Sequence, residues 1–152
     1  MPITFVGVKN RYLIAAMLIA VTAFVAYESL PPSSDNRIQS RFVTAARDGD
    51  IAALRRLHSD GAVVDGPSSS DHGANFGGPA LYEAIDCEHT ETVRWLLDHG
   101  ANPNLVIATE TPLEIAEYEL AKRPTSRAMH DIIILLQSRG AKHLAELSGK
   151  RH

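Results

Sequence analysis

The sequence predicts an all-α protein: a solenoid of about three stacked helix pairs, preceded by a single N-terminal transmembrane helix. Three observations lead to this prediction. One pattern of apolar residues ending in Gly-Ala recurs after a shift of 39 residues, and recurrence on this scale indicates a solenoid. An unbroken apolar run lies near the N-terminus. The chain of 152 residues is 45% hydrophobic and 22% charged, which is typical of a globular protein.

The N-terminal segment has the pattern of a membrane anchor. Lys9 and Arg11 precede the uncharged apolar run Tyr12–Tyr27, and the pair Pro31-Pro32 follows it. A membrane-spanning helix needs about 20 apolar residues. The run is slightly shorter, but a tyrosine at each end suits the membrane interfaces. Since the closest basic residues precede the run, we expect a bacterial single-pass inner-membrane protein whose C-terminal domain lies in the periplasm.

The alternative is a signal peptide that is removed, which would leave a soluble periplasmic protein. Cleavage after Ala26 puts the bulky Phe24 where a small residue is needed, and cleavage after Ala23 falls inside the apolar run. We therefore expect residues 1–30 to form an uncleaved signal anchor. Residues 31–40 then form a linker and the start of a leading helix.

The repeated pattern extends over residues 41–143. Each copy has a first helix, a second helix with spaced aliphatic residues, and a closing Gly-Ala pair. The corresponding residues are Phe42–Ala45, Leu54, Leu57 and Gly61-Ala62; Leu81–Ala84, Val93, Leu96 and Gly100-Ala101; and Thr111–Ala116, Ile133, Leu136 and Gly140-Ala141. We expect the repeats at about residues 41–77, 78–110 and 111–143, with Leu54, Leu96 and Leu136 along one common apolar seam.

Local signals place the helix ends. A leading helix is expected over residues 35–48. Side chains suited to cap the later helices are Asp50, Thr90, Thr111 ahead of Pro112, and Thr125 or Ser126. Gly61, Gly100 and Gly140 each follow an apolar helix, where a left-handed residue ends it. In the tail, residues 144–152, Leu144 and Leu147 are expected to pack against the last core face.

Two segments resemble the ankyrin repeat. Thr111-Pro-Leu-Glu-Ile-Ala116 is similar to the motif that opens the family's first helix, and residues 93–104 are similar to its second helix and exit. The resemblance implies stacked helix pairs with fingertip loops and a function in protein binding. Two departures are extra residues in the loop 65–78, expected as a long fingertip, and a longer third repeat around Pro124.

No residue set predicts catalysis, a cofactor or a metal site. Ser70, Asp71 and His72 lie in a Gly/Ser-rich loop, which lacks the rigidity that a catalytic triad requires. Cys87, the only cysteine, and His89 offer two ligands, fewer than a zinc site uses. Trp95 and His99 are expected to be structural. We therefore predict that the protein is not an enzyme.

The charge distribution points to a protein partner. Residues 78–120 carry nine acidic residues and one basic residue, which argues against nucleic-acid binding and favours a basic protein. By the resemblance, the binding surface contains Tyr82, Glu83, Asp86, Leu105, Val106, Ile107, Glu110, Glu114, Glu117 and Tyr118. The alternatives are that the acids only solvate the stack and that residues 105–107 pack as a hairpin strand.

The predicted function is that of a membrane-tethered protein–protein interaction module. An immunity or inhibitory protein would be one example of such a module. The alternative is an accessory protein of an envelope stress or peroxide-defence enzyme. A hydrolase using the loop residues 70–72 is the least favoured interpretation.

Overall fold

The computed structural model of the chain describes residues 34–66 and 78–149. These residues form helices α2 (Ser34–Asp48), α3 (Ile51–Ser59), α4 (Ala80–Asp86), α5 (Thr90–Asp98), α6 (Pro112–Lys122), α7 (Arg127–Ser138) and α8 (Leu144–Leu147). The predicted anchor and the loop residues Ser70, Asp71 and His72 lie outside the described ranges. Within those ranges, no helix has the length and apolar character needed to cross a membrane.

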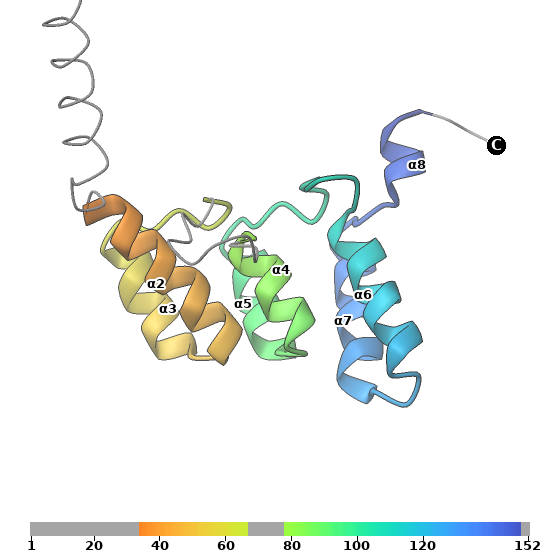
Figure 1. Cartoon of the computed structure of the whole chain (residues 1–152), viewed down its shortest axis with the longest axis horizontal. Helices are drawn as coiled ribbons and strands as arrows, with labels where there is room; N and C mark the ends of the chain where they lie inside the picture. Colours follow the sequence, from red (N-terminus) through yellow and green to blue (C-terminus); the bar gives the residue numbers. More distant parts are fainter. Residues whose placement is uncertain (1–33, 67–77, 150–152) are drawn as a thin grey trace, which may run out of the picture. The chain divides into compact units, whose positions relative to one another are not determined.

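The helices alternate between two rows. The first helices of the pairs, α2, α4 and α6, pack against one another in order, and the second helices α5 and α7 pack together in the other row (Figure 1). Each pair also packs internally, as α2 does with α3 and α6 with α7. The described residues form no strand beyond one isolated antiparallel bridge, between Ile107 and Glu110. This helical stack agrees with the predicted fold class.

A continuous apolar seam joins the three pairs. Leu54, Leu96 and Leu136 are each 0% exposed and belong to one cluster of buried residues, as the sequence pattern predicted. Burying a leucine side chain contributes about 1.5–3 kcal/mol, so the seam supplies much of the stability. Trp95 is buried, as predicted for a core residue, and stacks on His99 with ring centroids 3.9 Å apart.

The last helix does not extend this seam. No residue of α8 is buried, and Leu147 remains 40% exposed. The prediction that Leu144 and Leu147 pack against the last core face is therefore wrong. The physical reason is that α8 is joined to α6 through polar groups, because the backbone N–H of Leu144 donates to Glu114.

Most predicted caps are confirmed. The Asp50 carboxylate accepts from the N–H of Ala53 at 2.9 Å, and the Ser126 hydroxyl accepts from the N–H of Met129 at 3.2 Å. Thr111 and Glu114 cap each other's backbone N–H groups at the start of α6. The prediction for Thr90 is wrong: His89 occupies the cap position, and the Thr90 hydroxyl donates instead to the carbonyl of Ala128 on α7.

The glycine turns also form as predicted. Gly61, Gly100 and Gly140 have φ angles of 104°, 92° and 80°, which side chains rarely adopt. A further turn links the two helices of each of the first two pairs. There Gly49 has a φ of 73°, while its equivalent 39 residues later, Glu88, has a φ of 58° despite its side chain. The contacts of the Glu88 carboxylate with Arg123 and Ser126 offset this backbone strain.

Candidate protein-binding face

A short hairpin at the tip of the second repeat presents apolar side chains. Ile107 and Glu110 exchange two backbone hydrogen bonds of 3.1 Å, and Ala108 completes the turn with a φ of 57°. Leu105 and Ile107 are half-buried, whereas Val106 is 41% exposed. The hairpin is limited to one bridge, so residues 105–107 form no extended strand.

The side chain of Tyr82, on α4, supports this hairpin through its hydroxyl group. Its hydroxyl lies 2.6 Å from the carbonyl oxygen of Leu105 and 2.8 Å from that of Glu110, and it donates to them. The side chain is only 9% exposed, and burial raises the pKa of Tyr82 to about 12, so the donor stays protonated at neutral pH. Tyr82 was predicted among the exposed contact residues, but its position makes it a support for the hairpin.

Successive tips are tied to one another by hydrogen bonds. The Asp65 carboxylate of the first repeat accepts from the N–H of Asn102 at 3.0 Å. Asn104 continues the series: its amide donates to the carbonyl of Gly140 at 3.0 Å, and its oxygen accepts from the N–H of Lys142 at 2.8 Å. The tips therefore have fixed spacing, which keeps the apolar side chains in a defined arrangement.

The acidic side chains near α4 are largely paired within the stack. The guanidinium of Arg47 donates to Glu83 at 2.9 Å, and this hydrogen bond raises the pKa of Arg47. Arg123 bridges Glu88 and Glu119 at 2.6 and 2.7 Å. The pairs Arg47–Glu83 and Arg123–Glu88 connect neighbouring repeats, and together with Arg123–Glu119 they leave less free negative charge than the sequence count implies.

Two further acids meet the C-terminal segment. Burial opposes ionisation of Glu114, but hydrogen bonds from Thr111 and from the N–H of Leu144 outweigh it and lower its pKa. Glu117 lies 2.9 Å from Nε2 of His143, and this hydrogen bond is the main cause that raises the pKa of His143. Both carboxylates are therefore partly occupied by the chain itself.

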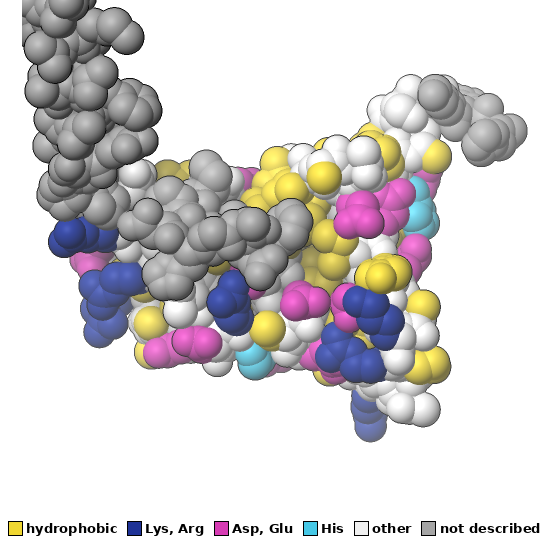
Figure 2. All heavy atoms as spheres, in the orientation of Figure 1, with side chains coloured by type: hydrophobic (Ala, Val, Ile, Leu, Met, Phe, Trp, Pro, Cys, Tyr) yellow, Lys and Arg dark blue, Asp and Glu magenta, His cyan; other side chains and the backbone are white. Residues whose placement is uncertain are grey.

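The remaining predicted residues form a mixed apolar and acidic surface. Tyr118 is 62% exposed on α6, and Asp86 and Glu110 make no ion pair within the described ranges. Figure 2 shows hydrophobic side chains gathered between α4 and α6, close to acidic ones. We call this surface the candidate face and define it by Asp86, Leu105, Val106, Ile107, Glu110, Glu114, Glu117 and Tyr118.

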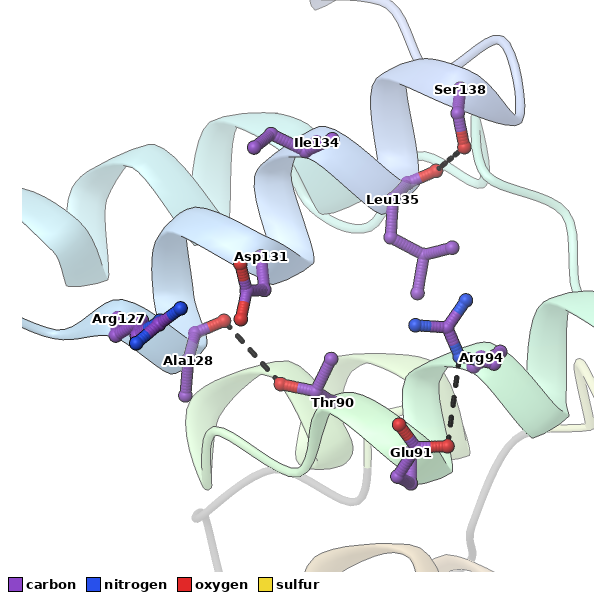
Figure 3. Close-up of a pocket in the computed structure, with 9 residues that line it drawn as sticks. All are labelled: Thr90, Glu91, Arg94, Arg127, Ala128, Asp131, Ile134, Leu135 and Ser138. Atoms are coloured by element: carbon purple, nitrogen blue, oxygen red, sulfur yellow. Dashed lines mark hydrogen bonds and ion pairs between the residues drawn. The ribbon is translucent and has the colours of Figure 1, made fainter.

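A groove lies between α5 and α7, in the other row of helices (Figure 3). It has a volume of about 650 Å³ and is lined by Thr90, Glu91, Arg94, Arg127, Ala128, Asp131, Ile134, Leu135 and Ser138. Arg94 lies 3.6 Å from Glu91, and the Ser138 hydroxyl donates to the carbonyl of Leu135 on its own helix. The Thr90 hydroxyl likewise donates to a backbone carbonyl, that of Ala128.

Cys87 and His89 have structural surroundings. Burial, followed by the nearby carboxylates Asp86 and Glu83, raises the pKa of the Cys87 thiol, which disfavours the reactive thiolate. Nε2 of His89 lies 2.8 Å from the carbonyl oxygen of Arg47 and so donates to it. Within the described residues, no group of three or more His, Cys, Asp or Glu side chains is placed to hold a metal ion.

The arrangement defines a class of protein: a solenoid of helix pairs, in which each repeat packs against its neighbours. Residues 77–107 match the family model of the ankyrin repeat. This segment includes α4, α5 and the first half of the tip hairpin, and it supports an ankyrin-repeat protein. Ankyrin repeats generally mediate protein–protein interactions. No curated protein matches the chain.

Proposed function

We propose that this protein binds a protein partner through the candidate face. The observation that carries the proposal is the pair Val106 and Tyr118, which expose large apolar surfaces on a tip and a first helix of the stack. Aromatic and aliphatic anchors that can be fully desolvated dominate binding energy in protein interfaces.

The hairpin that carries Val106 is also preorganised. Tyr82 fixes it from the core side, and Asn104 ties it to the third repeat. A surface that is already ordered loses less conformational entropy when it binds, which leaves more of the contact energy for affinity. Glu110, which pairs with Ile107 on the hairpin, adds negative charge beside the apolar side chains, which favours a partner with basic residues around an apolar centre.

The proposal includes a membrane tether formed by Tyr12–Tyr27, with the repeats on the periplasmic side. Its support is the sequence pattern: a basic flank, an apolar run and a proline-rich exit. The mass of the mature protein tests this part, because loss of about 25 residues by signal cleavage would contradict an uncleaved anchor.

Site-specific photo-crosslinking in cells tests the binding face. A photoreactive residue is placed at Tyr118 or, as a matched control, at Ile134. The two side chains are similarly exposed, at 62% and 64%, but Ile134 lines the groove in the other row of helices. We expect a discrete crosslinked product from position 118, and likewise from position 106, but not from position 134. Crosslinks from position 134 alone, or none from any position, would overturn the proposal.

A further inference from the structure

The chain's own C-terminal segment occupies the end of the candidate face formed by the third repeat. The N–H of Leu144 donates to Oε1 of Glu114 at 3.0 Å, and Nε2 of His143 lies 2.9 Å from Oε2 of Glu117. Figure 2 shows a histidine beside acidic side chains below α8. Two of the carboxylates that the sequence assigned to partner binding are thus engaged by residues 26 and 30 positions further along the chain.

The attachment of α8 is shallow. The helix has four residues, none of them buried, and its cap closes on itself through His143 and Glu146 at 3.2 Å. The preceding segment is held differently, because Asn104 binds both Gly140 and Lys142. Few bonds and little buried apolar area make a segment open readily, so α8 can leave while residues 140–142 stay in place.

We infer that α8 binds reversibly to Glu114 and Glu117 and that the protonated form of His143 holds it there. In this position α8 competes with the partner for this end of the candidate face. Only the competition between α8 and a partner rests on the proposed function. The attachment itself stands on the contacts between α8 and α6. When α8 leaves, Glu117 and one oxygen of Glu114 become available to a basic side chain.

The charges around His143 set the direction of the pH dependence. Glu117 and Glu114 face it from α6, Glu146 faces it from α8, and Lys142 precedes it. The hydrogen bonds with Glu117 and Glu146 raise the pKa of His143 above its ordinary value of 6.5. The contact between protonated His143 and Glu117 is therefore fully present below pH 6.5 and is lost as the pH rises through the raised pKa of His143.

Millisecond hydrogen exchange on the full chain tests the attachment without any partner. Protection of the amides of residues 144–148, corrected for intrinsic exchange rates, is compared at about pH 6 and about pH 9, on either side of the histidine titration. We expect Glu117→Gln to lower protection at the acidic pH by about two- to five-fold, the size expected for one partly exposed ion pair. It should also remove most of the pH dependence.

The matched control is Glu91→Gln, which makes the same change at an exposed carboxylate on α5, 3.6 Å from Arg94. This control should leave protection of the tail unchanged. Equal protection of residues 144–148 in the wild type and Glu117→Gln at the acidic pH, or no pH dependence in the wild type, would overturn the attachment by His143.

The crosslink from position 118 tests the competition, using His143→Ala, which removes the contact with Glu117 and leaves α6 unchanged. We expect the yield at about pH 6 to rise by at least about two-fold, in line with the loss of one ion pair. An unchanged yield in a variant whose tail exchanges faster would overturn the competition and leave the proposed function standing. No crosslink from position 118 or position 106 in either background would overturn the proposed function and the competition together, while the exchange result would still decide how α8 is held.

Discussion

Replacing Tyr82 by phenylalanine isolates the bond that supports the tip hairpin. The change removes one hydroxyl and leaves the ring, so the packing of α4 is kept. The lost group donates to the carbonyls of Leu105 and Glu110 at 2.6 and 2.8 Å from a position that is 9% exposed. The net loss for one buried hydrogen bond is about 1–1.5 kcal/mol in the free energy of unfolding.

The same hydroxyl predicts a loss of stability in alkali. The pKa of Tyr82 is about 12 in the folded chain, and the ordinary value is 10.0. The raised pKa means that the protonated form is favoured by folding, so this contribution is fully present below pH 10 and is lost as the pH rises towards 12. Two pH units correspond to at most about 2.7 kcal/mol, and solvent screening reduces this to about 1–2 kcal/mol.

Urea denaturation followed by the fluorescence of Trp95, the only tryptophan, measures both effects. Tyr118→Phe is the control. Because Tyr118 is 62% exposed, loss of its hydroxyl should change the free energy of unfolding by less than about 0.5 kcal/mol. Hydrogen exchange should show faster opening of residues 105–110 in Tyr82→Phe alone. Equal stability of the two variants, with unchanged exchange of the hairpin, would refute the role given to Tyr82.

Three further changes test the seam and the turns, each measured by urea denaturation. Leu96→Ala, at a fully buried position, should cost about 2–5 kcal/mol, and a loss below about 1 kcal/mol would contradict a tightly packed seam. Gly100→Ala should cost about 1–2 kcal/mol from the φ of 92° alone, because nothing lies within 4 Å of the added methyl group; a neutral result would contradict the left-handed turn. Glu88→Gly relieves the strain but loses the ion pair with Arg123 and the hydrogen bond from the Ser126 hydroxyl, so it should destabilise the wild type more than an Arg123→Ala background, where no ion pair is left to lose. An equal effect in both backgrounds would show that the contact between Glu88 and Arg123 does not offset the strain.

Features that depend on neighbouring residues could be predicted from the sequence. Thr111 followed by Pro112 is a helix start in any context, because one side chain caps the free N–H groups and the other lacks an N–H to satisfy. Gly100 after an apolar helix is likewise sufficient to predict a left-handed stop. The repeated pattern predicted the seam because Leu57, Leu96 and Leu136 each lie four residues before the closing glycine, and Leu54 lies about one helical turn before Leu57 on the same face.

Features that depend on distant residues could not be predicted. The acidic count over residues 78–120 suggested an open negative surface, but Arg47 lies 36 positions from Glu83 and His143 lies 26 positions from Glu117. Tyr82 was placed on the exposed surface because its helix position is exposed in an idealised repeat. In the structure the tip hairpin lies against Tyr82, and the Tyr82 hydroxyl is within hydrogen-bond distance of two of its carbonyls. Thr90 suited a cap by type, but its neighbour His89 occupies that position.

The bonds between successive tips have a consequence for how such a chain can change in length. Asp65 bonds to Asn102 and Asn104 bonds to Gly140, so these connections within the described ranges each run from one unit to the next. A duplicated cassette of some 35–40 residues, inserted between two units, would meet the same donors and acceptors on both sides. The surface can therefore grow in whole modules while the older contacts are kept.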